Sequence, residues 1–553
     1  MTTTLLTPES FDDQFSEEEI PTILSKNWNR NTSFHVFLTH RYNLGFYRKV
    51  KMTEEEIKAR QFALASAKEK EARENKDKEE DKSLGRKGGK VADNIPAGRP
   101  ENARIAGDLA KDSVGNIGVI DSTRVLVDSH EKMDSLMAEQ ARQDSIDATM
   151  KQEYVPVTSF IHTLDINNYN RIYQAYESPN NYYMDTFYNY NNEGKYGNDS
   201  IYDQFKYLSV KNTFAIALLE GFNKYAKAGL KGFISYEHCN FQMPDLLEET
   251  NQYFLRKYSE GHLTVGGQLS KTQGKTLHYN LDAELWVAGP DAGNLTVDFS
   301  TDLNFPLFGD TVQLAAKAFF YRINPFFYQT SYHSKHFWWE NNFSAETRTH
   351  IEGIFSYPKT HTQLRVAVEE IQNYTYFGMN YNVTENFGRS DLTGGVYQAS
   401  GNINVMTAQL RQDFRLGILN WENIITYQNS SNKEVLPLPD LNIFSNLYLK
   451  FKIAKVLSVE LGGDVTFFTK YYAPDYLPML GQFAVQQNSE SRVKLGGYPF
   501  VDVYANFHLK RARFFVMMSH VNNASGNKMM FLTPHYPTNG SILRFGVSWN
   551  FYN

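Results

Sequence analysis

The most regular feature of the chain is an alternation of apolar and polar side chains that recurs over most of its length. In residues 276–288, Leu277 and Leu281 fall on one face and Asp282 on the other. Because successive side chains of a β-strand point to opposite faces, this pattern predicts a strand with one apolar and one polar face. The same pattern returns at 294–305, 440–453, 457–468, 500–510 and 541–551. The chain is therefore expected to be all-β.

Segments of about ten residues with alternating polarity are typical of transmembrane β-barrels, and a soluble β-sandwich is the alternative. Mean hydropathy is −0.49 and no run of apolar residues is long enough for a spanning helix, which a barrel does not need. Aromatic residues make up 14% of the chain, and girdles at two membrane interfaces would account for them. Hydrocarbon cannot satisfy an open sheet edge, so we expect one closed antiparallel barrel. Its expected lipid-facing residues are Leu277, Leu281, Leu285, Val297, Phe299, Leu303, Leu461, Val465, Phe467, Val501, Val503, Leu543, Phe545 and Val547.

The connections between the predicted strands alternate between short and long. Short turns are predicted at 220–224, 272–275, 306–310, 357–360, 419–420, 455–456 and 511–512. Longer loops are predicted at 241–260, 324–341, 378–401, 430–439, 474–498 and 522–540, and only 289–293 is brief on that side. Bacterial barrels have short periplasmic turns and long external loops, whereas a sandwich would not sort its loops so regularly. The short turns are therefore assigned to the periplasm.

Because successive strands cross the membrane in opposite directions, the N-terminal part of the chain can be placed as well. The strand 34–48 runs towards the periplasm, the segment 154–164 runs back towards the outside, and 165–204 forms an external loop. Residues 1–33 then lie outside the cell and 49–153 in the periplasm. The first residues lack the basic and apolar regions of a signal peptide. With about 17 strands predicted, an even strand number requires at least about 18, so we expect an N-terminally incomplete form of a longer protein.

The predicted insert, residues 49–153, differs in composition from the strands. From Glu54 to Lys82 it is dominated by charged residues and alanine, which allows a helix but offers almost no apolar stripe. Such a segment cannot build its own core. We expect a partly helical, partly disordered periplasmic tether; contact with a periplasmic protein or peptidoglycan is the alternative role.

Four strings resemble a known family. They are LTHRYNLGFYRK (38–49), EYVPVTSFIHTL (153–164), YYAPDYLPMLGQF (471–483) and GGYPFVDVYANFHLKRARFFV (496–516). They are similar to the putative-porin family of outer-membrane β-barrels from Bacteroidota, a group of Gram-negative bacteria. The resemblance implies an outer-membrane porin, in contact with lipid, that lets small hydrophilic solutes diffuse passively. It implies a further N-terminal portion but no site residues.

The polar faces of the strands supply the residues expected to line the lumen. The candidates are Asp282, Glu284, Asp298, Asp302, Lys317, Glu346, Arg348, Lys450, Glu460 and Asp464, with Glu369, Lys452, Asp502, His508 and Lys510 on the same faces. Both signs are present, which favours a weakly selective aqueous pore or charge pairs that stiffen the wall. The first four candidates are carboxylates on two neighbouring strands and are expected to form an acidic patch.

Other functional classes receive less support. Histidines border the predicted loops without a nucleophile motif, so no enzyme and no cofactor are predicted. His333 and His336 have a spacing that could hold a metal, but a third ligand is not evident. The single cysteine excludes a disulfide framework, and a net charge of −6 with both signs interleaved gives no nucleic-acid signature. The remaining alternative is a structural barrel that scaffolds an envelope complex through 49–153.

Overall fold

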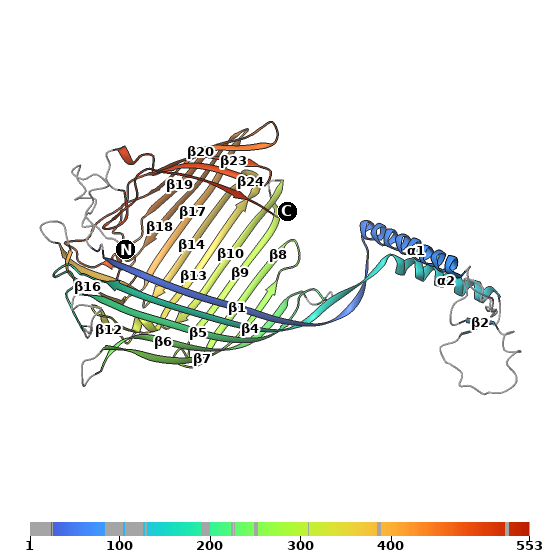
Figure 1. The fold of residues 1–553 in the computed structure, drawn as a ribbon, viewed down its shortest axis with the longest axis horizontal. Coiled ribbons are helices and arrows are strands. Elements are labelled where there is room, and N and C mark those ends of the chain that lie inside the picture. Colours follow the sequence, from blue (N-terminus) through green and yellow to red (C-terminus); the bar gives the residue numbers. More distant parts are fainter. Residues whose placement is uncertain are drawn as a thin grey trace. The chain divides into compact units, whose positions relative to one another are not determined.

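The computed structural model describes residues 24, 26–82, 103–105, 125–127, 130–189, 200–222, 225, 227–247, 253–307, 309–383, 389–525 and 530–551. A single sheet of 17 strands dominates it, which confirms the all-β prediction and the predicted strand number. Figure 1 shows this sheet curving around an interior. The strands are β1 (Asn27–Lys51), β4 (Met150–Ala175), β5 (Ile201–Leu218), β6 (Gly229–Leu246), β7 (Tyr253–Lys271), β8 (Leu277–Ala288), β9 (Leu295–Leu307), β10 (Asp310–Ile323), β13 (Glu346–Tyr357), β14 (Thr362–Gln372), β17 (Ile403–Leu416), β18 (Leu419–Ser430), β19 (Leu441–Ile453), β20 (Leu457–Phe468), β23 (Phe500–Leu509), β24 (Ala512–Ser519) and β27 (Ile542–Trp549).

Strand pairing follows the order of these strands along the chain. β1 pairs with β4, and from β4 to β27 each strand pairs antiparallel with the next. From β7 onward the connections alternate between shorter and longer as predicted, but residues 247–252, between β6 and β7, are fewer than residues 219–228, between β5 and β6. Gly417 and Ile418 alone join β17 to β18, for example, and Gly417 takes the positive φ that tight hairpins favour.

The two faces of the sheet differ as predicted. Of the residues expected on the apolar face, most are exposed and the remainder half-buried, and no second sheet among the described strands covers them. The exposed ones are Leu277, Leu281, Leu285, Phe299, Leu303, Leu461, Val503, Leu543, Phe545 and Val547. Since water-exposed apolar surface on this scale is unfavourable, this outward face requires an apolar environment. The opposite, inward face holds the polar side chains.

Several strands extend beyond their predicted ends. The predicted strand 34–48 is part of β1, the segment 154–164 is part of β4, and the predicted loops 165–204 and 241–260 are too long. β5, β6 and β7 have 18, 18 and 19 residues, whereas about 9–11 cross a bilayer. Outside hydrocarbon the outward face need not be apolar, so the alternation fades before the strand ends. Pro244, inside the predicted loop 241–260, lies within β6 opposite Leu255.

The long connections contain structure of their own, which the sequence did not predict. The predicted loop 324–341 holds α3 (Phe327–Thr330), β11 (Ser331–His333) and β12 (Trp338–Glu340). The predicted loops 378–401 and 474–498 contribute β15 (Thr375–Val383), β16 (Arg389–Gln398), β21 (Asp475–Leu477) and β22 (Gln482–Gln486), which form a four-stranded sheet. β25 (Phe531–Thr533) and β26 (Tyr536–Pro537) pair with each other. We call these elements, together with residues 176–189, the loop cap.

Residues 44–157 form a separate compact unit. It contains α1 (Glu54–Lys82), β2 (Ala103–Ile105), β3 (Val125–Val127) and α2 (His130–Ala148). α1 starts with a capping box, because the Thr53 hydroxyl accepts from the Glu56 N–H and the Glu56 carboxylate from the Thr53 N–H. Of the predicted N-terminal segment 1–33, residues 1–23 and 25 lie outside the described residues. No helix in the described part of the chain has the length and apolarity needed to cross a membrane.

Candidate functional site: the polar wall and the loop cap

The four predicted acidic residues lie together on the inward face of β8 and β9. Asp282 stands directly opposite Asp298 in the strand register, and His278 opposite Asp302. The His278 Nδ1 lies 3.0 Å from Asp302 Oδ2. The Tyr321 hydroxyl donates to Asp298 at 2.5 Å. The four carboxylates therefore lie on one face of two paired strands, where neighbouring polar groups bind Asp298 and Asp302.

Most of the other predicted lumen residues form cross-strand pairs of opposite charge. Lys317 lies 3.8 Å from Glu352 and Lys450 lies 2.7 Å from Glu460, each pair on neighbouring strands. Glu284 of the acidic group lies 3.3 Å from Lys211 of β5, two strands beyond its own neighbour β7. The Arg348 Nε donates to Glu369 at 2.7 Å. Glu346 instead accepts the backbone N–H of Thr375, at 2.8 Å, and Asp464 stands opposite Asp502. The wall is thus lined by both signs, and most of these pairs join neighbouring strands.

The loop cap has a hydrophobic core that includes inward-facing residues at the ends of the long strands. Tyr173 of β4, Phe205 of β5 and Met243 of β6 are buried against the cap residues Phe337 and Met479. Figure 1 places β12 and β16 at the end of the sheet where these loops gather. Because the strand residues point inward, the cap lies across the inner side of this rim.

Arg171, on the inward face of β4, fastens one cap segment to the wall. Its guanidinium donates to the carbonyl oxygens of Pro478 and Met479, at 3.0 and 2.6 Å, and to Asn29 Oδ1 at 2.8 Å. The residue is only 7% exposed. Charge-assisted bonds to buried carbonyls are among the stronger hydrogen bonds in proteins, so Arg171 holds the 478–479 turn against the strand.

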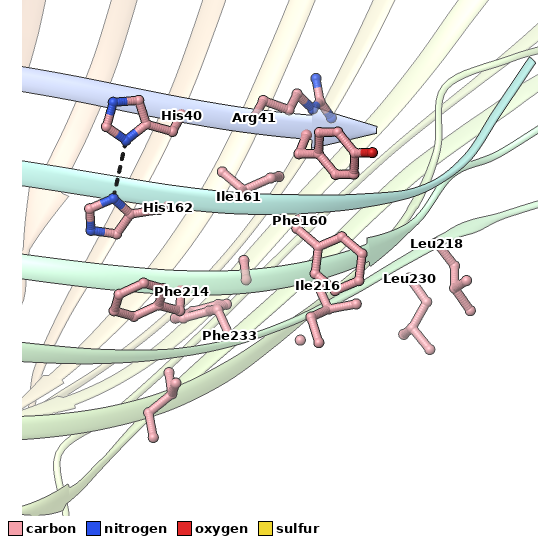
Figure 2. Close-up of a pocket in the computed structure, with 14 residues that line it drawn as sticks. His40, Arg41, Phe160, Ile161, His162, Phe214, Ile216, Leu218, Leu230 and Phe233 are labelled. Carbon is pink, nitrogen blue, oxygen red and sulfur yellow. Dashed lines mark hydrogen bonds between the residues drawn. The ribbon is translucent and has the colours of Figure 1, made fainter. Parts of the chain in front are cut away.

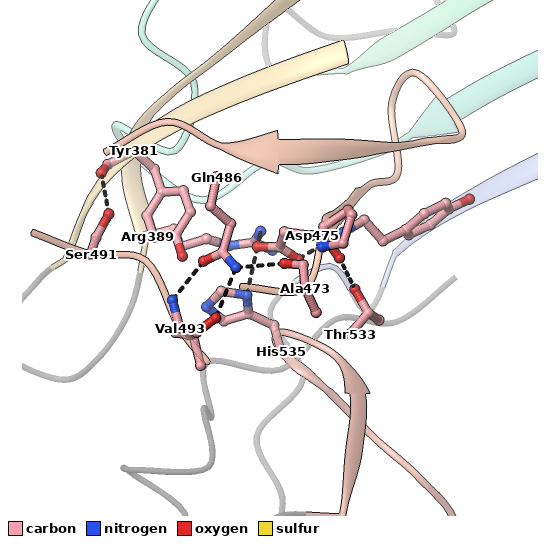
Figure 3. A network of polar contacts seen from close by, with 11 residues as sticks. Tyr381, Arg389, Ala473, Asp475, Gln486, Ser491, Val493, Thr533 and His535 are labelled. Carbon is pink, nitrogen blue, oxygen red and sulfur yellow. Dashed lines mark hydrogen bonds and ion pairs between the residues drawn. The ribbon is translucent and has the colours of Figure 1, made fainter. Parts of the chain in front are cut away.

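A buried ionic network joins three cap segments (Figure 3). Arg389 of β16 and His535 both contact the Asp475 carboxylate, at 3.2 and 2.9 Å. The side chains of Arg389 and Asp475 are 1% and 0% exposed. Burial lowers the pKa of His535, an effect that Asp475 partly offsets. The carboxylate therefore compensates a buried guanidinium and links β16, β21 and the segment before β26.

The two histidines considered as metal ligands point to different partners. The His333 ring stacks on Trp338, and its Nε2 lies 2.6 Å from Glu340. His336 stacks on Tyr183 and donates from Nδ1 to a backbone carbonyl at 2.6 Å, while burial lowers its pKa to about 4. Within the described ranges, no group of three or more His, Cys, Asp or Glu side chains is arranged to hold a metal ion.

A hollow of about 880 Å³ lies along β1, β4, β5 and β6 (Figure 2). His40 and His162 meet there, with 3.4 Å between their Nδ1 atoms, and the His162 ring stacks on Phe214. Phe214 and Ile216 are 58% and 56% exposed, which places them on the outward face. This hollow is therefore almost wholly apolar and belongs to the outside of the sheet.

A large antiparallel sheet with an apolar outward face and a polar inward face is typical of outer-membrane proteins. The chain belongs to the putative-porin family: the family model described as "Putative porin" matches residues 1–553, which confirms the resemblance. No curated protein matches the chain.

Solved structures that are similar to the chain include a siderophore receptor, a ferric enterobactin receptor and a copper transporter. The siderophore receptor PirA from Acinetobacter baumannii is 11% identical with a TM-score of 0.48, over 73% of this chain and 62% of that one. The ferric enterobactin receptor PfeA is 11% identical with a TM-score of 0.46, and the match covers 71% of this chain and 63% of that one. The copper transporter OprC is 11% identical with a TM-score of 0.47, and the match covers 73% of this chain and 67% of that one. The chain thus spans less than two thirds of the length of the first two.

Sequence reasoning missed Arg171, Arg389, Asp475 and His535, which hold the cap together. A signal was present for Asp475, since it falls within the string 471–483 that carries the family resemblance. For the two arginines the alternation gave no signal, because Arg171 lay in the predicted external loop 165–204 and Arg389 in the predicted long loop 378–401. The string 471–483 therefore contains a residue that joins segments of the cap.

Proposed function

We propose that the sheet closes into one transmembrane β-barrel in the outer membrane of a Gram-negative bacterium and that small hydrophilic solutes diffuse through its interior. The observation that carries the proposal is the separation of the two faces over 17 paired strands. Apolar side chains outside suit lipid, and charged pairs inside are stable only where the interior is wet. The family supports transport, and no chemistry or energy coupling is required for it.

The proposed topology places the loop cap outside the cell and the 44–157 unit in the periplasm, with residues 1–33 external. It is supported by the shorter and longer connections that alternate from β7 onward. Closure requires the edge of β27 to pair with another strand, for which β1 is the candidate. The acidic patch and the other predicted lumen residues would then line the channel.

The loop cap adds a size limit to this proposal. Its core covers inward side chains at the external rim, so solutes would have to pass between the cap and the wall. A dry core joined by buried ion pairs is rigid, so the passage would have a fixed width. We therefore expect a narrow pore that admits small solutes and excludes large ones.

Liposome swelling tests this function. The full protein, reconstituted in liposomes, should allow swelling in small sugars and progressively less in larger oligosaccharides. Absence of swelling with every solute, from a protein whose strand content is intact by circular dichroism, would contradict passive transport. The chain would then be a scaffold that acts through residues 49–153, and the partner would be sought among periplasmic proteins and peptidoglycan.

A further inference from the structure

A second cavity, of about 550 Å³, opens on the inward face under the loop cap. It lies between β5, β6, β7 and β8 on the wall side and the segment 323–343 on the cap side. Its lining combines three carboxylates, one histidine and several aromatic rings: Glu237, Glu260, Asp291, His262, Tyr207, Phe241, Trp286, Phe326, Phe327 and Phe343. None of the described residues that line it is a lysine or an arginine.

The carboxylates of this cavity differ from those elsewhere on the wall. Glu284, Glu369 and Glu460 each have a lysine or arginine within ion-pair distance. In the described part of the chain, His262 is the only cationic or titratable base within ion-pair distance of Glu260 and Asp291, at 3.6 and 3.3 Å. Asn324 also donates to Asp291 at 3.3 Å, and Lys211, opposite Glu237 in the strand register, pairs with Glu284. Three acidic groups around one imidazole leave an excess of negative charge in a partly enclosed space, which favours a cation.

His262 gives a second, independent indication of a ligand. Its side chain is 5% exposed, yet its Nδ1 has no hydrogen-bond partner, because the approach to Asp291 lacks hydrogen-bond geometry. A buried polar atom without a partner is costly. A ligand with N–H donors would satisfy the neighbouring carboxylates and allow the imidazole to take up a hydrogen bond.

The aromatic wall defines the rest of the ligand. The Phe241 ring stacks on Phe327, with 4.3 Å between centroids, and lies 5.6 Å from the Phe326 ring. Phe326 itself is 47% exposed, so part of its ring is free to contact a guest. Aromatic faces attract cations and pack against apolar groups. A bare metal ion would neither pack against these aromatic rings nor fill the volume of the cavity.

We propose that this cavity binds a small organic cation, an ammonium or guanidinium group on an apolar body, as the preferred solute of the barrel. The charged group would lie among Glu237, Glu260 and Asp291, and the apolar body against Phe326 and Phe241. This inference deepens the proposed function and rests on it, because the site faces the interior that solutes would cross.

Isothermal titration calorimetry on the full protein in detergent tests the site without any requirement for conduction. Phenethylammonium should bind, and phenylacetate, which has the same ring and the opposite charge, should not. The double variant Glu260→Gln/Asp291→Asn should weaken phenethylammonium binding about tenfold or more. A matched control, Glu422→Gln/Asp440→Asn, removes two carboxylates elsewhere and should leave binding unchanged.

A third variant separates the aromatic contribution from folding defects. Phe326→Leu keeps all charges and should weaken phenethylammonium more than methylammonium, with the thermal unfolding temperature unchanged. Equal binding of phenylacetate, tighter binding of Ca²⁺ than of phenethylammonium, or unchanged affinity in the double variant would overturn the proposal. If binding is absent while liposome swelling is normal, only this inference fails; if both are absent, the proposed function fails as well.

Discussion

The wall and the loop cap use charge in opposite ways. Along the wall, pairs such as Lys450 and Glu460 lie across neighbouring strands and keep 53% and 32% of their side-chain surface exposed. In the cap, Arg389 and Asp475 are fully buried and belong to distant segments. An exposed pair adds at most about 1 kcal/mol, whereas breaking a buried pair costs about 3–5 kcal/mol. The wall charges therefore suit contact with solutes, and the cap charges hold a structure together.

The largest expected effect comes from removing the shared carboxylate of the cap. Asp475→Asn leaves the Arg389 guanidinium buried without a counter-charge and should destabilise the cap by about 3–5 kcal/mol. Hydrogen exchange measured by mass spectrometry should show lost protection in β16 and β21 while the wall strands stay protected. Asp440→Asn, which removes the exposed partner of Lys433, is the control and should change little. Equal effects of the two variants would remove the distinction between cap and wall.

A mutation that creates a cavity in the core of the cap should destabilise the cap by a similar or slightly smaller amount. Phe337 is 2% exposed, and truncation of such a side chain costs about 3–5 kcal/mol before relaxation of its surroundings. Phe337→Ala should make the cap sensitive to added protease and leave the wall resistant. Phe545→Ala, on the outward face, should leave the cap protease-resistant. Cleavage of the wall strands in Phe337→Ala would show that cap and wall fold as one unit.

Neutralising the acidic patch should change selectivity without changing the fold. Replacement of Asp282, Glu284, Asp298 and Asp302 by Asn and Gln removes fixed negative charge and should lower the preference for cations severalfold. The reversal potential in a salt gradient measures this preference. A fully retained cation preference would show that these carboxylates do not face the conducting path.

Acid should weaken the cap by a modest amount. The pKa of His336 is lowered to about 4 by burial, from an ordinary value of 6.5. Between these two values the opened cap binds more protons than the folded cap, so stability falls as the pH drops through this window. Burial lowers the pKa of His535 and acts in the same direction. Protease sensitivity of the cap should rise from pH 7 to pH 5, and less so in His336→Gln; an unchanged rate would contradict the buried neutral histidines.

The wall could be predicted from the sequence because its pattern is local. Each strand shows alternation within about ten residues, and pairing with the next strand follows from the order along the chain. The cap could not be predicted in this way. Asp475 and Arg389 are 86 positions apart, and Arg171 and Met479 are 308 apart. Contacts of this range depend on tertiary packing and carry no periodic signal.

The candidate site also has a part that could be predicted from the sequence and a part that could not. The acidic residues of β8 and β9 were found because neighbouring strands bring alternate side chains together on one face. The strand ends were misplaced because alternation is needed only where a strand crosses hydrocarbon. Short elements such as β21, with only three residues, have too little sequence to show a period and are stabilised by the Asp475 network instead.

Single-channel conductance in a planar bilayer tests the central claim, a polar channel narrowed by a loop cap, most directly. The full protein should show small, steady current steps, and Asp475→Asn/Phe337→Ala should show clearly larger ones. Equal conductance of the two proteins would contradict the role of the cap. Silence of both, with intact strands, would contradict the channel itself.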